Sequence, residues 1–455
     1  MKLRSIILFL SIFTLLVPVL AQKNSKEKPN AEIIKMMKEV SAKNIETTIR
    51  KLASFGTRNT LSEQDNPVRG IGAARDYLFG EFQKISADCG NCLQVEKQTF
   101  TQAPTANKRV AAPTVLTNVY AILKGTTDPT RIYVVSGHYD SMCNLDATDI
   151  TCDAPGANDD ASGTAASVEM ARVMSKYKFD ATIIFITVPG EEQGLLGATY
   201  FAEQAKKTGM NIEAMFTNDI IGGVTSYKNA PDRQSVRVFA EGVASDETEQ
   251  QANSRRSVGG ENDSQSRQLG RYIKEVADVY SPKFKVQLIY RRDRYLRGGD
   301  HIPFLENGFA AVRFTEPHED YTHQHQSVKI VDGAQYGDLP EFVDFGYVAN
   351  VTRVNAAAIA NLAFAPAKPK NVFILTKELT NNTGLKWDAN TDADLAGYEV
   401  VWRDTTSAFW TNSVFVGNAL TYTAKEMSKD NYFFGVRAVD KNGNKSPVVY
   451  PRPMR

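Results

Sequence analysis

The chain has 455 residues, with 53 basic and 52 acidic side chains, so its formal net charge is +1. This balance gives no reason to expect a nucleic acid or an anionic membrane as a partner. The hydrophobic content of 42% is ordinary for a globular protein, and the length favours more than one domain.

Residues 1–21 are expected to form a secretory signal peptide and not to belong to the fold. Lys2 and Arg4 form a charged start, residues 6–20 are an apolar run, and Ala21 ends a cleavage site of small residues. The run is short for a membrane span, and no later segment has about 18 uninterrupted apolar residues. The mature protein is therefore expected to be secreted or periplasmic, without a membrane span.

Strand and helix patterns alternate through most of the mature chain. Helical spacing of apolar residues predicts helices at residues 30–52, 72–85, 161–177, 195–206 and 346–364. Short apolar runs predict strands at residues 93–100, 116–123, 132–136, 182–188, 214–217 and 309–315. This alternation predicts a three-layer α/β fold, with a mixed, mainly parallel sheet and helices on both faces.

The clearest boundary is the Pro- and Lys-containing stretch Ala365-Pro-Ala-Lys-Pro-Lys370, which is typical of a linker. After it, the chain contains only short strand patterns. The sequence therefore predicts a large unit at residues 22–364, a linker at residues 365–370 and a small all-β unit at residues 371–455.

The four cysteines are predicted to form disulfides, because an even number in an exported chain favours them. They are Cys89, Cys92, Cys143 and Cys152, and three pairings are possible. The local pairing, Cys89 with Cys92 and Cys143 with Cys152, closes short loops. A redox motif at Cys89–Cys92 and a four-cysteine zinc site are less consistent with the surrounding pattern and the compartment.

Histidines and carboxylates follow several of the predicted strands. The candidates are His138, Asp159, Glu191, Glu192, Asp219 and His323. Ligands of open α/β sheets bind beyond the carboxyl ends of the strands, where these side chains would converge. Histidine and carboxylate without cysteine is the donor chemistry of a catalytic metal site and not of a closed structural zinc site.

The neighbouring Glu191 and Glu192 are expected to have different tasks. Adjacent side chains point in opposite directions in extended backbone, so one could bind metal while the other addresses bound water. Gly190 and Gly194 flank the pair and allow a close approach of the backbone to a ligand.

Three further side chains are interpreted from their neighbours. Either Asp159 or Asp160 should cap the following helix, which leaves the other free to point inward. Asp140, two residues after His138, could orient that ligand. His323 and His325 share one loop, and their chemistry alone does not separate them.

These residues lie in motifs that resemble those of the zinc aminopeptidases of family M28. The matching segments are Gly137-His138-Tyr-Asp140-Ser141, Gly156-Ala-Asn-Asp159-Asp160-Ala-Ser-Gly163, Glu191-Glu192-Gln-Gly194-Leu-Leu-Gly197, Asn218-Asp219 and Gly299-Asp300-His301-Ile-Pro-Phe304. The resemblance implies two zinc ions (Zn2+) per chain. It assigns His138 and Asp219 to one zinc, Glu192 and His323 to the other, Asp159 to both, Glu191 as general base and Asp140 as partner of His138.

The resemblance also implies hydrolysis of the first peptide bond of peptides that have a free amino terminus. Relatives often carry a tyrosine directly before the last histidine, but here Thr322 has that place and Tyr321 lies one residue earlier. Arg294, Tyr295 and Arg297 are candidates for substrate contacts, with structural salt bridges as an equal alternative.

The tail after Lys370 resembles a fibronectin type III domain. The match lies in Leu385-Lys-Trp387, residues 397–403 and residues 432–440, and Trp387 is expected in its core. The domain could dock to another protein or to the peptidase unit, and it should be dispensable for chemistry on short peptides.

Three other functions remain open. A carboxypeptidase would need a cation such as Arg294 or Arg297 for the terminal carboxylate of its substrate. A glutaminyl cyclase would use one zinc, and an intact His138 argues against it. A non-catalytic binding protein would have lost a ligand or the base, and none is missing.

Overall fold

The computed structural model describes residues 29–225 and 230–455. The predicted signal peptide therefore lies outside the described residues. Among the described residues, no helix has both the length and the apolar character that crossing a membrane requires.

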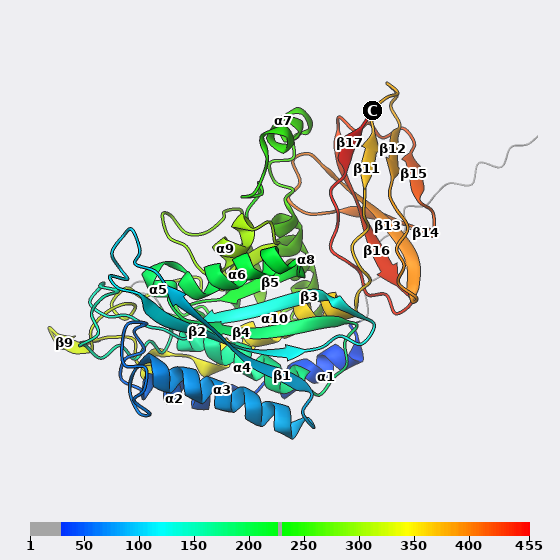
Figure 1. Ribbon diagram of the computed structural model, residues 1–455. Coiled ribbons are helices and arrows are strands. Elements are labelled where there is room, and N and C mark those ends of the chain that lie inside the picture. Colours follow the sequence, from blue (N-terminus) through cyan, green and yellow to red (C-terminus); the bar gives the residue numbers. More distant parts are fainter. Residues whose placement is uncertain (1–28, 226–229) are drawn as a thin grey trace, which may run out of the picture.

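An eight-stranded mixed sheet forms the centre of the larger unit (Figure 1). Its order is β1-β2-β4-β3-β5-β8-β6-β7. The strands are β1 Leu93–Gln102, β2 Thr114–Leu123, β3 Asp128–His138, β4 Ala181–Val188, β5 Asn211–Asn218, β6 Ser235–Phe239, β7 Lys285–Ile289 and β8 Ala311–Thr315. The pairs β4-β3, β3-β5, β5-β8 and β6-β7 are parallel, whereas β1-β2, β2-β4 and β8-β6 are antiparallel. The α/β class is confirmed, and parallel pairing outnumbers antiparallel pairing by one pair.

Helices cover both faces of this sheet because its central strands are apolar on both sides. Tyr133 and Val135 of β3 lie in the larger core, and Val134 between them lies in the smaller one. The larger core packs against α1 Ala31–Glu39, α2 Ala42–Ala53, α3 Gly70–Asp88, α4 Ala161–Met174, α8 Gln265–Tyr280 and α10 Phe345–Phe364. The smaller core packs against α6 Leu196–Thr208 and α9 His301–Glu306.

The predicted helix at residues 30–52 is wrong in one respect, because the structure divides it into α1 and α2. Val40 and Ser41 have extended backbone, and the Ser41 side chain accepts a hydrogen bond from the Asn44 N–H. Serine is a favoured residue at this capping position, so it starts a new helix within an apolar pattern that looks continuous.

The carboxy-terminal residues form two small sheets around a separate core. One sheet has the order β15-β12-β11-β17 and the other the order β14-β13-β16. The strands are β11 Phe373–Leu375, β12 Thr383–Lys386, β13 Leu395–Asp404, β14 Asn412–Gly417, β15 Thr421–Ala424, β16 Tyr432–Asp440 and β17 Arg452–Met454. Trp387 is buried among these strands, as expected of a core residue.

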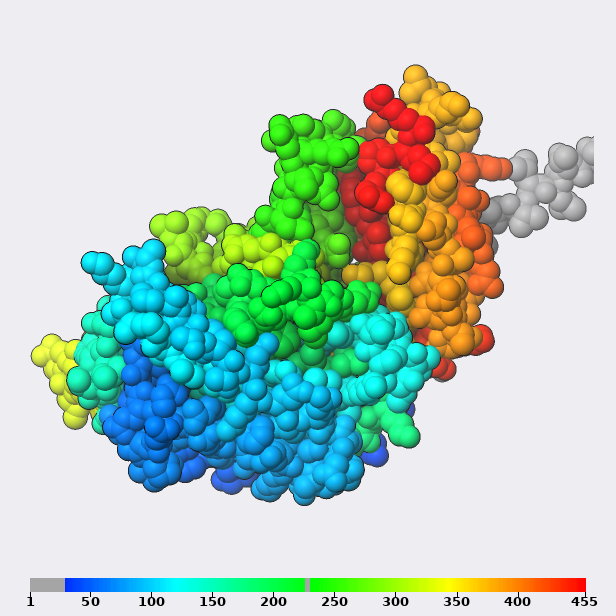
Figure 2. Space-filling model, viewed as in Figure 1, coloured from blue at the N-terminus to red at the C-terminus, as the bar shows by residue number. Residues whose placement is uncertain are grey.

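This β unit lies against α8 and the segment before it, beside α7 Glu249–Val258 (Figures 1 and 2). Arg403 forms an ion pair of 2.8 Å with the buried Asp263. Arg271 of α8 donates to the Ala408 carbonyl at 2.7 Å, and the Trp410 indole donates to Gln268 at 3.0 Å. The tail is thus held by directed polar contacts as well as by the linker.

Both disulfides have the local pairing that the sequence favoured, Cys89 with Cys92 and Cys143 with Cys152. The second closes a loop that touches the loop after β8, because the Leu145 N–H donates to the His325 carbonyl at 3.0 Å. The remaining short elements are α5 Glu191–Gly194, β9 Lys329–Val331, β10 Ala334–Tyr336 and the 3-10 helix η1 Pro340–Phe342.

Candidate metal centre

Histidines and carboxylates from five segments meet at the carboxyl ends of β3, β4, β5 and β8. His138 is the last residue of β3, Asp219 follows β5, and Glu191 and Glu192 open α5 after β4. The parallel pairing of these strands brings their ends to one edge of the sheet.

The donor atoms form two groups, His138 with Glu191 and Asp219, and Asp159 with Glu192 and His325. Within each group the atoms lie within 4.8 Å of one another. Asp159 joins the groups, because its Oδ1 lies 3.1 Å from His138 Nε2 and its Oδ2 lies 2.8 Å from His325 Nε2. His325 Nε2 is also 3.1 Å from Glu192 Oε1.

Two carboxylate oxygens of this cluster accept no hydrogen bond of good geometry among the described residues: Asp219 Oδ1, and Glu192 Oε1, which has only the ion-pair contact with His325. Their residues are at most 5% exposed. Buried carboxylates without a compensating charge are costly, so the cluster fits a cation. Imidazole nitrogen and carboxylate oxygen together suit zinc.

The pKa values of the cluster reflect the same excess of negative charge. Burial raises the pKa of Glu191 well above its usual value, as do the charges of Asp219 and Glu192, although His138 opposes this. Burial lowers the pKa of His138, but its hydrogen bonds to Asp140, Asp159 and Asp219 outweigh burial and hold that pKa well above its usual value. A bound cation would replace this proton, since metal ligation requires neutral imidazole.

Asp140 and Asp160 connect the segments that carry the donors. Asp140 is buried, with Oδ1 3.3 Å from His138 Nδ1, and it accepts hydrogen bonds from the backbone N–H groups of Glu191 and Glu192. Asp160 caps α4 by accepting from the Gly163 N–H at 2.9 Å. The expected division is confirmed: Asp160 is the cap, and Asp159 points into the cluster.

The backbone predicted for the two glutamates is wrong. Glu191 and Glu192 lie in the short helix α5, which begins after Gly190 at φ +78°. A left-handed residue is accommodated most easily by glycine. The two side chains nevertheless belong to different donor groups: Glu191 lies with Asp219, and Glu192 lies with Asp159.

His323 does not lie in the cluster, so its predicted place among the ligands is wrong. Its ring stacks on Phe342 at 3.7 Å, and Nδ1 faces Asp320 at 3.5 Å. Backbone hydrogen bonds from His323 and Gln324 to the Asp320 carbonyl form a turn, and His325 follows it at φ +56°. This turn directs His325 into the cluster and His323 away from it.

The residue directly before the inward-facing histidine is therefore Gln324. Thr322 and Tyr321 do not occupy the position at which relatives often carry a tyrosine. Gln324 Nε2 donates to Asp159 Oδ2 at 2.9 Å. Tyr321 is 64% exposed and lies on the outer side of the loop.

Most arginines near this site form ion pairs with carboxylates. Arg294 contacts Asp293, Glu319 and the Gly298 carbonyl, which favours the salt-bridge alternative. Arg297 donates to Glu319 at 2.7 Å. Tyr295 is 76% exposed and accepts a hydrogen bond from Arg291.

Two buried residues beside the cluster were missed by sequence reasoning. Arg313 of β8 places Nη1 2.9 Å from Asp219 Oδ2. Neither carboxyl oxygen of Asp300 has a hydrogen-bond partner among the described residues, and burial raises the pKa of Asp300 to about 7. Asp300 lies in the motif Gly299-Asp300-His301-Ile-Pro-Phe304. The burial of Asp300 and Arg313 beside the metal centre depends on the folded chain and could not be read from the sequence.

Residues 118–338 match the model of peptidase family M28. A probable zinc metalloprotease of Pyrenophora tritici-repentis is 47% identical over 94% of this chain and 88% of its own length. A probable zinc metalloprotease of Leptosphaeria maculans is 47% identical over 93% of this chain and 98% of its own. The solved structure of LapB from Legionella pneumophila has a TM-score of 0.52 and 18% identity, covering 75% of this chain and 78% of that one. The aminopeptidase LapA of the same organism has a TM-score of 0.51 and 18% identity, covering 76% and 78%.

Proposed function

Because the chain belongs to peptidase family M28 and is a zinc metalloprotease, we propose that it is an exported aminopeptidase with two zinc ions. The observation that carries the proposal is the pair of donor groups that share Asp159. One group alone would suffice for a single metal, whereas the bridging position of Asp159 suits two.

In this proposal His138 and Asp219 would hold one zinc, Glu192 and His325 would hold the other, and Asp159 would serve both. Zinc bound there would supply a water of lowered pKa and would polarise the carbonyl of the bond to be cut. Glu191 is the general base that accepts the proton of the attacking water and passes it to the leaving amine. Asp140 keeps the His138 ring in orientation through its 3.3 Å contact with Nδ1.

Two alternative enzymes are less well supported. A carboxypeptidase needs a free cation for the terminal carboxylate, but Arg294 and Arg297 both contact Glu319. A cyclase with one zinc would use only one of the two donor groups. A binding protein without activity is disfavoured, because Glu191 and a histidine for each group are present.

The proposed domain plan is a signal peptide at residues 1–21, a peptidase unit at residues 22–364, a linker at residues 365–370 and a fibronectin type III domain at residues 371–455. Export is supported by two disulfides, which persist in oxidising compartments. The fibronectin-like identity is supported by two small antiparallel-rich sheets packed around Leu385, Trp387 and Val436.

The direct test uses pairs of short peptides that differ only in whether the amino terminus is free or acetylated. The proposal predicts stepwise release of the first residue from the free peptides and no cleavage of the acetylated ones. Release of the last residue would support a carboxypeptidase, and ring closure of amino-terminal glutamine without hydrolysis would support a cyclase.

A further inference from the structure

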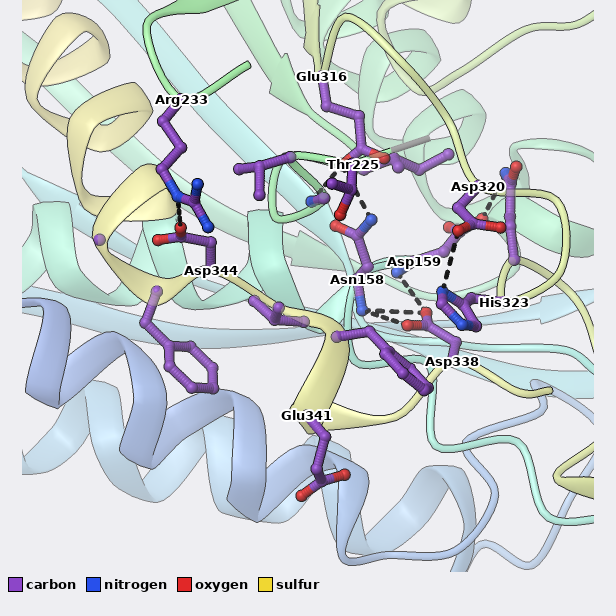
Figure 3. A pocket seen from close by; sticks show the side chains of 18 residues that line it. Asn158, Asp159, Thr225, Arg233, Glu316, Asp320, His323, Asp338, Glu341 and Asp344 are labelled. Carbon is purple, nitrogen blue, oxygen red and sulfur yellow. Dashed lines mark hydrogen bonds and ion pairs between the residues drawn. The ribbon is translucent and has the colours of Figure 1, made fainter. Parts of the chain in front are cut away.

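A cavity of about 530 Å³ opens directly beside the metal centre and has no task in the chemistry proposed above. Asp159 and Gln324, which hydrogen-bond to each other, both lie in its wall. Figure 3 shows Asp159, Glu316 and Asp338 among the side chains that line it, with the Arg233–Asp344 pair to one side. Its volume lies within the range of about 300–1,000 Å³ that is common for ligand pockets.

Two oxygen atoms in this wall have no hydrogen-bond partner among the described residues, Glu316 Oε1 and Gln324 Oε1. Glu316 is 1% exposed and Gln324 is 7% exposed. A carboxylate only accepts hydrogen bonds, so donation to Asp159 fixes the orientation of the Gln324 amide. Both atoms are acceptors, and a buried acceptor without a donor costs free energy. The cavity therefore suits a ligand group that donates.

The charges in the wall favour a cationic donor. Its carboxyl groups are Asp159, Glu316, Asp320, Asp338, Glu341 and Asp344, and burial raises the pKa of Glu316 to about 8, so this one is mostly anionic only above that pH. Among the described lining residues, Arg233 is the only lysine or arginine, and it is paired with Asp344 at 2.6 Å. His323 also lines the cavity, and burial lowers its pKa, so it adds little positive charge near neutral pH.

Glu316 is held so that one oxygen anchors the carboxyl while the other, which is buried, receives no hydrogen bond. Oε2 accepts hydrogen bonds from Asn158 Nδ2 at 2.9 Å and from the Gly223 N–H. Oε1 lies 2.4 Å from the position that a Cβ at residue 223 would occupy. Glycine at this position therefore leaves the space that the Glu316 carboxyl occupies.

We propose that this cavity binds the side chain of a lysine or arginine at the amino terminus of the substrate, with Glu316 Oε1 and Gln324 Oε1 as acceptors. The inference rests on the proposed aminopeptidase function, in which the first residue of the substrate lies at the metal centre. Its side chain then enters the cavity that adjoins Asp159.

The test compares kcat/KM of the zinc-loaded protein for fluorogenic amides of single amino acids. Lysine and arginine amides are compared with norleucine and Nε-acetyl-lysine amides, which have similar length and no charge. At pH 9, where the Glu316 carboxyl is mostly ionised, we expect a preference of at least about tenfold for the charged pair, which corresponds to about 1.4 kcal/mol. This is the size expected for a hydrogen bond to a charged group.

Glu316→Gln keeps the shape of the side chain and an acceptor for Asn158, but it replaces the free oxygen with a donor. We expect the ratio of lysine to norleucine turnover to fall about tenfold. The matched control is Glu241→Gln, since Glu241 is also a buried carboxyl, 6% exposed, that accepts from Ser245 and does not line the cavity. Its ratio should stay within twofold of the wild-type value.

Gly223→Ala is a second variant, in which the added methyl group would collide with both carboxyl oxygens of Glu316 and displace them, so it should lower the same ratio. A preference for neutral residues that neither variant changes would overturn the inference and leave the aminopeptidase proposal standing. Absence of turnover for every free-amino substrate by zinc-loaded protein would instead overturn the proposed function.

Discussion

Two buried clusters of charge among the described residues have opposite balance. At the strand ends, the four carboxylates Asp159, Glu191, Glu192 and Asp219 meet two histidines, and two carboxylate oxygens accept no hydrogen bond of good geometry among the described residues. Under the carboxy-terminal sheets, the single carboxylate of Asp263 accepts hydrogen bonds from Gln268, Arg271 and Arg403. Even with Arg313 paired to Asp219, the carboxylates of the first cluster outnumber its positive groups and fit a cation from outside the chain, whereas the carboxylate of the second is neutralised by the chain itself.

Removal of metal should have the largest effect on activity and stability, because only the cluster at the strand ends is expected to bind metal. A chelator should reduce peptidase activity to background and lower the melting temperature, because a ligand that binds only the folded state stabilises it. Zinc should restore both. The measurements are activity and thermal unfolding before and after dialysis against chelator, and full activity of metal-free protein would contradict the account.

Glu191→Gln should be next in size, because glutamine has the shape of glutamate but cannot accept the proton. The expected loss of kcat is about 10²–10⁴-fold, the range for a general base, with zinc content unchanged. Glu192→Gln is the matched comparison and should lower zinc content. If Glu191→Gln loses zinc and Glu192→Gln does not, the two roles are reversed.

Arg403→Met should affect stability and leave chemistry intact. It removes the 2.8 Å ion pair to Asp263, which keeps its contact with Arg271. Breaking a buried pair so that one charge is left uncompensated costs about 3–5 kcal/mol, and the remaining contact with Arg271 should keep the loss below that range. Chemical denaturation should show the loss, whereas kcat/KM of the folded fraction should match the wild type.

A chain ending near Ala367 should likewise keep the kcat/KM of the wild type on short peptides in its folded fraction. A large drop in kcat/KM without unfolding would mean that the tail shapes the active site.

The smallest expected effect is a pH dependence of selectivity. Burial raises the pKa of Glu316 to about 8, so its carboxyl is mostly neutral below that pH and anionic above it. The lysine ammonium, with a usual pKa of about 10.4, stays charged over this interval. The ratio of lysine to norleucine turnover should therefore rise a few-fold from pH 7 to pH 9. Glu316→Gln should abolish the rise, and a ratio that falls with pH would contradict it.

The central strands and most of the donor cluster were predictable, because they depend on local patterns. The apolar runs at residues 132–136 and 182–188 became β3 and β4, and His138 and Asp219 follow strands whose ends must meet in a parallel sheet. Asp160 as a helix cap was likewise a local property.

Properties that depend on distant contacts could not be predicted. The choice of His325 over His323 depends on a turn at Asp320 and on the hydrogen bond from Leu145, which is far away in sequence. The backbone of Glu191 depends on the left-handed Gly190. Asp263 and Arg403 are 140 residues apart, and no periodicity connects them.

The zinc content of His325→Ala and His323→Ala tests the central claim most directly. Both histidines lie on one loop, so each variant is the control for the other. The wild type and His323→Ala should each bind two zinc ions per chain, whereas His325→Ala should lose one of them. Loss of zinc from His323→Ala, with two ions retained by His325→Ala, would contradict the two-group metal centre described above.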